Sequence, residues 1–304
     1  MRYATFLFLL AISSVFVPTA KAADAQGCSM RRFTSLPMST ISDGRITVPV
    51  AINGHPASFM VDTGGISATM SRQLANEIGK EPKPFRRALI GVGGAVMSSS
   101  ISADDFALGP LHGKDIVVFI DERMSGGGVD GTLAPEMMHR FDVDYDFRHS
   151  TINFFSQEHC PGKVVYWTIG GAIVIPMDLQ PNGKVRIPVL VDGKKIMAIL
   201  DTGSVTSFIG MNAARSLGIS SDDKELKLRR SYGYKDRYKE YDYPFKTLTL
   251  DGLTVNNPHI KIMSDATLSG MGTDLILGIS FLRQLHLYIA YKEGNLYVTP
   301  ASAE

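Results

Sequence analysis

The triplet Asp-Thr-Gly occurs twice in this sequence, each time directly after a short apolar run. The copies are Asp62-Thr63-Gly64, preceded by Phe-Met-Val, and Asp201-Thr202-Gly203, preceded by Ala-Ile-Leu. A chain of this length and of average composition would contain the triplet by chance only about 0.04 times. Two carboxyl groups that meet in a buried site can share a proton and activate a water molecule. The repeated triplet therefore predicts acid–base chemistry by Asp62 and Asp201.

The two triplets belong to a longer internal repeat. Shifting residues 45–79 by 139 positions lays them over residues 184–218 without a gap, and the two triplets coincide. A second ungapped match, shifted by 144 positions, lays residues 129–147 over residues 273–291. A period of this length indicates two duplicated lobes rather than a solenoid of small repeats. The alternative is two unrelated β-rich domains with similar strand patterns.

Short β-rich runs broken by glycine surround each triplet and must position it. Residues 46–61 predict a hairpin that turns at Asn53-Gly54, and Asp192-Gly193 marks the same turn in the second copy. Each triplet is therefore expected where a buried strand ends in a turn. Residues 71–78 and 211–217, each followed by a glycine, predict short helices.

These residues resemble the aspartic proteases, in particular the retropepsin-like branch that occurs as single-chain duplications in exported bacterial proteins. The resemblance covers roughly residues 45–155 and 185–298, and Ile276-Leu277-Gly278 matches the apolar-apolar-Gly block of that family. It implies an all-β fold with a few short helices, built as two homologous pepsin/retropepsin-like lobes with the active site in the cleft between them. It also implies an aspartic endopeptidase that acts on polypeptides without a cofactor. A single chain that supplies both aspartates is expected to be a monomer.

The residues next to the aspartates have expected supporting roles. Gly64 and Gly203 allow a tight turn and leave backbone N–H groups near the carboxylates. By resemblance, the hydroxyl groups of Thr63 and Thr202 brace the two loops against each other. Ser204 follows the second triplet where glycine follows the first, so only Asp201 has a neighbouring hydroxyl group for its outer oxygen. The two aspartates are therefore expected to differ.

A glycine-rich segment in the first lobe matches the hairpin that closes over substrate in retropepsins. Its central residues are Gly91, Val92, Gly93 and Gly94. Substrate would bind beneath it as an extended strand; an ordinary surface hairpin is the alternative. The equivalent segment of the second lobe is rich in tyrosine and either lines the substrate groove or forms a solvated hairpin.

One block of the first lobe departs from the family pattern. Residues 130–135 read Asp-Gly-Thr-Leu-Ala-Pro where the second lobe has Asp-Leu-Ile-Leu-Gly-Ile. Ala134 is small enough to replace the glycine, but Pro135 is expected to alter the local backbone.

The chain divides into five predicted segments. Residues 1–22 read as a cleaved secretory signal because Arg2, an apolar stretch and Ala20-Lys21-Ala22 follow in the required order; an uncleaved anchor is the alternative. The protein is therefore expected to be exported, periplasmic or secreted. Residues 23–42 form an N-terminal arm, residues 43–157 lobe 1, residues 158–176 a connector and residues 177–304 lobe 2.

Charge and cysteine content restrict the partners. Loss of Arg2 and Lys21 with the signal changes the formal net charge from +1 to −1, which argues against nucleic acid as a partner. The seven histidines show no metal-ligand spacing, so no metal site is expected. Cys28 and Cys160, the only cysteines, are expected to form a disulfide bond in an oxidising compartment, with two free thiols as the alternative.

A function of another class remains open at this stage. The same duplicated fold could be a non-catalytic peptide-binding protein of the cell envelope. Both aspartates and both threonines are present, and this favours the enzyme.

Overall fold

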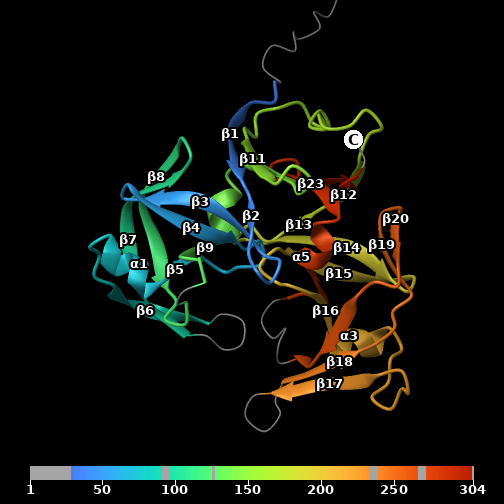
Figure 1. Cartoon of the computed structure of the whole chain (residues 1–304). Helices are drawn as coiled ribbons and strands as arrows, with labels where there is room; N and C mark the ends of the chain where they lie inside the picture. The colour runs from blue at the N-terminus through green and yellow to red at the C-terminus, as the bar shows by residue number, and fades with distance from the viewer. Residues whose placement is uncertain (1–28, 91–95, 125–126, 233–237, 266–271, 303–304) are drawn as a thin grey trace, which may run out of the picture.

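The computed structural model describes residues 29–90, 96–124, 127–232, 238–265 and 272–302, and these fold into two lobes joined by a shared sheet (Figure 1). Across the described residues the chain is mostly β, with four short helices. Figure 1 shows the first lobe in blue and green, the second in yellow and orange, and the shared sheet above the junction between them.

Lobe 1 is an eight-stranded sheet in the order β2-β3-β4-β9-β5-β8-β7-β6. Parallel β4–β9 and β5–β8 pairs lie within an otherwise antiparallel sheet. Its elements are β2 (Ser39–Thr40), β3 (Ile46–Ile52), β4 (His55–Val61), β5 (Thr69–Met70), α1 (Arg72–Glu77), β6 (Lys83–Ile90), β7 (Val96–Leu108), β8 (Leu111–Ile120), β9 (Gly131–Leu133) and α2 (Pro135–Met138).

Lobe 2 repeats this order in a ten-stranded sheet, β17-β18-β21-β16-β22-β15-β14-β19-β20, with β13 paired to β14. Its parallel pairs, β15–β22 and β16–β21, correspond to those of lobe 1. Its elements are β13 (Asp178–Leu179), β14 (Val185–Val191), β15 (Lys194–Asp201), β16 (Ser207–Gly210), α3 (Met211–Ser216), β17 (Lys227–Tyr232), β18 (Tyr238–Asp242), β19 (Thr247–Leu250), β20 (Leu253–Asn256), β21 (Ile260–Met263), β22 (Leu275–Gly278) and α5 (Ile279–Leu282).

The shared sheet has six strands in the order β1-β11-β10-β23-β24-β12. Three come from each half of the chain, and the central β10–β23 pair joins the halves. They are β1 (Arg32–Pro37), β10 (Asp142–Asp146), β11 (Thr151–Phe155), β12 (Ile173–Pro176), β23 (Leu285–Ala290) and β24 (Asn295–Pro300). Strands β1 and β12 lie in segments that the sequence predicted as an arm and a connector, so both segments are built into the sheet.

The predicted hairpins and helices are present. Asn53 and Gly54 have φ values of 51° and 79°, and Asp192 and Gly193 have 48° and 77°, the left-handed conformation that a tight two-residue hairpin needs. Helix α1 begins after Ser71, whose Oγ accepts a hydrogen bond from Leu74 N at 3.0 Å. The tight turns fix the register of the strands that lead to the two triplets.

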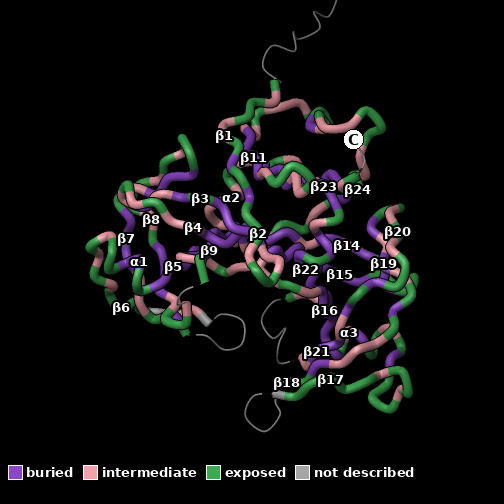
Figure 2. The backbone as a smooth tube through the Cα atoms, in the orientation of Figure 1, coloured by how far each residue is buried: buried purple, intermediate pink, exposed green. Residues whose placement is uncertain are grey.

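Apolar side chains of both lobes and of the shared sheet form one continuous core. Figure 2 shows buried segments running through each lobe and across the junction. Strands β10 and β23 are buried along almost their whole length because they lie in the middle of the shared sheet. The lobes are therefore not independent bodies joined by a linker.

Residues of the predicted connector cover the shared sheet through buried polar groups. His159 Nε2 lies 2.5 Å from Asp142 Oδ2, and Tyr166 donates a hydrogen bond of 2.7 Å to Asp144 Oδ2. The Trp167 ring stacks on the His286 ring with 4.3 Å between centroids. Burial of both Asp142 and Asp144 requires such partners, because an unpaired buried carboxylate is costly.

Candidate active site

The ends of strands β4 and β15 place the two aspartates at the junction of the lobes. Asp62 directly follows β4, and Asp201 is the last residue of β15. Each of these strands is paired in parallel with a short buried strand, β9 or β22, and with an antiparallel neighbour on its other side. Pairing on both sides leaves the strand end little freedom, so the position of each carboxyl group is fixed by the sheet.

The hydroxyl groups of Thr63 and Thr202 join the two loops in a symmetric network. Thr63 Oγ1 donates to Leu200 O at 2.8 Å and accepts from Thr202 N at 3.0 Å. Thr202 Oγ1 donates to Val61 O at 2.6 Å and accepts from Thr63 N at 3.1 Å. Both threonines are buried. Four hydrogen bonds thus cross between the lobes directly beneath the aspartates.

The glycines of the triplets leave room for the opposite carboxylate. A Cβ atom at Gly203 would lie 2.5 Å from Asp62 Cγ, and a Cβ atom at Gly64 would collide with the Asp201 carboxylate. Any larger residue would therefore separate the two aspartates. Each carboxyl group thus lies against the glycine of the opposite triplet, which makes the two carboxyl groups close neighbours, as a shared proton requires.

The two carboxylates differ in their backbone donors. Asp201 Oδ1 accepts from Gly203 N at 2.9 Å and from Ser204 N at 3.0 Å, whereas Asp62 Oδ1 accepts from Gly64 N at 3.1 Å. The Ser204 hydroxyl group does not make the contact that the sequence suggested. It donates instead to Thr206 O at 2.9 Å, so Ser204 reaches Asp201 through its backbone.

Burial controls the protonation of the pair. It raises the pKa of Asp62, while the charge of Lys184 opposes this shift. Burial and the neighbouring Asp62 charge raise the pKa of Asp201 to about 8. Two close carboxylates in a site of low dielectric constant cannot both ionise cheaply, so the pair keeps one proton above the usual carboxyl range.

Pro135 is accommodated without disrupting the strand before it. It is the first residue of helix α2, a position where the missing N–H group costs nothing within the helix. Strand β9 still pairs with β4, and Val61 lies opposite Leu133. The counterpart of Pro135 in lobe 2, Ile279, donates from N to Ser204 O at 2.8 Å, a hydrogen bond that a proline cannot make.

Two charged residues near the dyad were not identified from the sequence. Lys184 is only 7 % exposed, and Glu136 Oε1 accepts a hydrogen bond from Ala68 N at 2.5 Å in the loop beyond Asp62. Lys184 aligns with Arg45 in the internal repeat. A basic residue at the same position of both copies is the sequence signal that could have identified Lys184.

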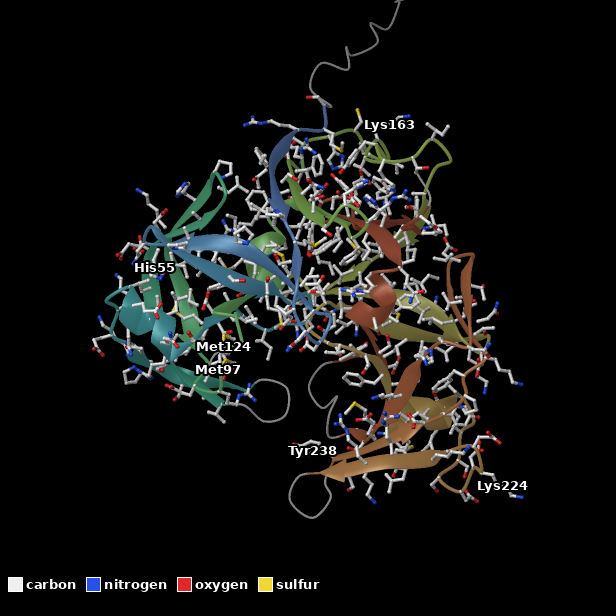
Figure 3. All side chains as sticks on the ribbon, in the orientation of Figure 1. His55, Met97, Met124, Lys163, Lys224 and Tyr238 are labelled. Atoms are coloured by element: carbon white, nitrogen blue, oxygen red, sulfur yellow. The ribbon has the colours of Figure 1, made fainter. Side chains whose placement is uncertain are left out.

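Some predicted residues lie outside the described part of the chain. These are Cys28 and the glycine-rich segment Gly91, Val92, Gly93 and Gly94, so the disulfide bond with Cys160 and the role of the hairpin stay predictions. Figure 3 labels Met97, near the start of β7, and Tyr238, the first residue of β18. Each of these strands directly follows a segment outside the described part of the chain.

Neither a metal cluster nor a membrane span is found in the described ranges. No group of three or more His, Cys, Asp or Glu side chains there could hold a metal ion. No helix there is long and apolar enough to cross a bilayer.

Comparison with known proteins agrees with this geometry. The model of the aspartyl protease family matches residues 48–134 and 187–281, which together make up more than half of the chain and contain one triplet each. The chain belongs to the aspartyl protease family. No match was found among curated proteins.

Solved structures show how widely this aspartyl protease fold is shared. The basic 7S globulin from soybean aligns over 90 % of this chain and 96 % of its own, with 8 % identity and a TM-score of 0.53. Conglutin gamma, a basic 7S globulin from lupine seeds, covers 90 % and 95 % with 9 % identity and a TM-score of 0.50. A retropepsin-like aspartic protease from Rickettsia conorii covers 42 % of this chain and 94 % of its own, with 18 % identity and a TM-score of 0.33. At these identities the two globulins establish the two-lobed fold alone.

Proposed function

We propose that this protein is an aspartic endopeptidase, which hydrolyses peptide bonds with a water molecule activated between Asp62 and Asp201. One observation carries the proposal: at the junction of the lobes, the carboxyl groups of Asp62 and Asp201 each lie against the glycine of the opposite triplet. The threonine network joins the two loops, and the two glycines leave room for the opposite carboxylates, so both serve this arrangement. A fold that only had to be stable would not keep two carboxylates together at this cost.

The chemistry follows from one proton shared by two carboxyl groups. The ionised carboxylate accepts a proton from water as the oxygen of that water attacks the peptide carbonyl carbon. The protonated carboxyl group donates its proton to the carbonyl oxygen as negative charge develops there. The resulting diol collapses when the carboxyl group that took the proton of water passes it to the amide nitrogen, a diol hydroxyl group returns its proton to the other carboxylate, and the C–N bond breaks. No covalent enzyme intermediate and no cofactor are needed.

The pH dependence follows from the same pair. Activity needs one ionised and one protonated carboxyl group, so it falls when the pair gains its second proton and again when it loses its last one. Because burial raises both pKa values, activity is expected to extend to higher pH than ordinary carboxyl groups would allow.

The test is cleavage of an unstructured protein at a series of pH values. Asp62→Asn and Asp201→Asn should each abolish cleavage while circular dichroism shows a folded chain. Asp115→Asn is the matched control, because this exposed aspartate lies in β8 at a φ of 54°, which asparagine also adopts. Wild-type protein that never cleaves, or Asn variants that still do, would contradict the proposal.

A peptide-binding protein on the same fold is the second candidate. It is favoured by the two globulin neighbours, whose names describe globulins, one of them from lupine seeds, and not proteases. A wild type that binds peptides without turnover, with binding unchanged in Asp201→Asn, would support it.

The proposal also covers the oligomeric state, the substrate class, the export and the disulfide bond of the protein. We expect a monomer that acts on polypeptides, is exported after loss of residues 1–22 and carries a Cys28–Cys160 disulfide bond. N-terminal sequencing and intact mass of the purified mature protein, with and without reductant, test the last two expectations.

A further inference from the structure

Hydrogen bonds fix the active-site loop of lobe 2, residues 201–207, to the start of helix α5. Ile279 N, the first residue of α5, donates to Ser204 O at 2.8 Å. Gly278 N, directly before it, donates to Ser207 Oγ at 3.0 Å. A Cβ atom at Gly278 would lie 2.9 Å from Ser204 O, so the loop and the start of the helix are in direct contact. The loop is therefore attached to the helix at two points.

Neither of these hydrogen bonds can form in lobe 1, because the residue types differ. Pro135 aligns with Ile279 in the internal repeat, and proline has no N–H group to donate. Ala68 aligns with Ser207, and alanine has no hydroxyl group to accept a hydrogen bond. The active-site loop of lobe 1, residues 62–68, is therefore expected to use another partner on helix α2.

The side chain of Glu136 is that partner. Glu136 is the second residue of α2, and its Oε1 accepts a hydrogen bond from Ala68 N at 2.5 Å. The loop also packs closely on the start of α2, since a Cβ atom at Gly65 would lie 3.0 Å from Ala134 Cβ. Glu136 Oε2 is buried and has no hydrogen-bond partner among the described residues. Water is therefore excluded from this side of the carboxyl group and cannot replace the bond to the loop.

The counterpart of Glu136 in lobe 2 shows that the side chain has taken over a task of the main chain. Ser280 aligns with Glu136, and Ser280 N donates to Val205 O in the loop at 3.2 Å. Lobe 2 thus attaches its loop mainly through main-chain donors of α5. Lobe 1 attaches the equivalent loop through a carboxylate side chain of α2.

The loop of lobe 1 carries groups that lie against both aspartates. Gly64 N donates to Asp62 Oδ1 at 3.1 Å, and a Cβ atom at Gly64 would collide with the Asp201 carboxylate. At the far end of the loop, Ala68 O accepts from Phe119 N at 3.0 Å. Ala68 is therefore bound through both its N–H and its C=O group, and its displacement would change the path of the loop between the two carboxylates.

We propose that Glu136 is a positioning residue for the hydrolysis. Its carboxyl group fixes the loop of residues 62–68 and thereby the distance of this loop from Asp201. Pro135 makes the side chain necessary, because it removes the main-chain donor that Ile279 provides in lobe 2. This role rests on the proposed protease function, since it concerns the geometry of the same aspartate pair.

The first test compares kcat and KM for a fluorogenic peptide, with each variant measured at its own optimal pH. Glu136→Met keeps the length of the side chain and removes the acceptor, so kcat should fall about 10-fold or more while KM changes less than about threefold. Glu136→Gln keeps an acceptor oxygen for Ala68 N, so its kcat should stay within about threefold of the wild type. Glu122→Met, which removes an exposed glutamate of the same lobe, is the matched control and should behave as the wild type. A kcat of Glu136→Met equal to that of the wild type, or an equal loss in both Glu136 variants, would overturn the proposal.

Amide hydrogen exchange followed by NMR tests the contact without cleavage. The N–H group of Ala68 should be protected in the wild type and in Glu136→Gln, and it should exchange about 10-fold or more faster in Glu136→Met. The N–H group of Ile279, which binds the loop of lobe 2, should exchange at the same rate in all three proteins. An equal rate for Ala68 in all three would contradict the role of Glu136.

Two further outcomes are informative. If Glu136→Met does not fold, an Ala68 N–H group that is protected in the wild type and in Glu136→Gln supports the proposal, and one that exchanges as fast as in an unfolded chain overturns it. A wild type that never cleaves would refute the protease function, and the exchange of Ala68 would still decide whether Glu136 fixes the loop.

Discussion

Loss of the threonine network should lower both the stability and the activity of the protein. Thr63→Val keeps the size and branching of the side chain and removes only the hydroxyl group. Leu200 O then loses a donor at 2.8 Å, and Thr202 N loses an acceptor at 3.0 Å. Both groups are buried, so water cannot replace the missing partner.

The magnitude follows from these two contacts. A buried polar group left without a partner costs about 1–3 kcal/mol. Two such groups should therefore lower the free energy of unfolding by about 3 kcal/mol, a large part of the about 5–15 kcal/mol that holds a typical protein folded. Because the same bonds set the separation of the aspartates, kcat should fall by about 100-fold, the effect of a displacement near 1 Å.

Urea unfolding and cleavage of a fluorogenic peptide measure the two effects together. Thr249→Val is the matched control: its hydroxyl group lies 2.9 Å from that of Thr254 at the surface, and its loss should change stability by less than about 0.5 kcal/mol. Thr202→Val should resemble Thr63→Val because the network is symmetric. If Thr63→Val were as stable and as active as the control, the reasoning about the network would be wrong.

Three further changes test other parts of the structure. Gly203→Ala should reduce kcat at least about 100-fold because its Cβ atom would lie 2.5 Å from Asp62 Cγ. Gly170→Ala should leave kcat unchanged in the same assay, because its Cβ atom would lie 3.7 Å from Thr168 Oγ1, an ordinary contact. Asp201→Asn should melt at the same temperature as the wild type at pH 3 and at a higher one at pH 8. The raised pKa of Asp201 favours the protonated form in the folded state, so wild-type stability is lost as pH rises from the ordinary value of 3.8 to about 8; equal melting temperatures at pH 8 would contradict this. Trp167→Ala should cost about 2 kcal/mol in urea unfolding, because the indole ring covers buried polar groups of the shared sheet, and an unchanged midpoint would show that the connector contributes nothing there.

The sequence predicted the dyad because its signals are local. Each triplet follows a strand whose start is set by a two-residue turn at Asn53-Gly54 or Asp192-Gly193, and duplication made the pattern visible twice. The strand β1 escaped prediction for the opposite reason. Its side chains show no regular alternation between buried and exposed positions, so it has no period to detect.

The charged surroundings of the dyad could not be predicted in the same way. Lys184 is buried, and helix α2, far away in the sequence, packs on Gly183 directly before it. The Ser204 hydroxyl group donates to Thr206 O and not to the carboxylate, a choice set by the fold of the loop. Such choices depend on distances between residues that periodicity and spacing do not encode.

The order of strands in the shared sheet has a consequence for the way this protein can be divided. A break between Phe155 and Ile173 would leave three adjacent strands on each fragment, and each fragment would have one newly bare border, β10 or β23. The backbone N–H and C=O groups along that exposed edge would be unpaired and available to bond with another strand. Separately produced fragments should therefore recombine into a working whole, and either one alone should pair with a second copy of itself.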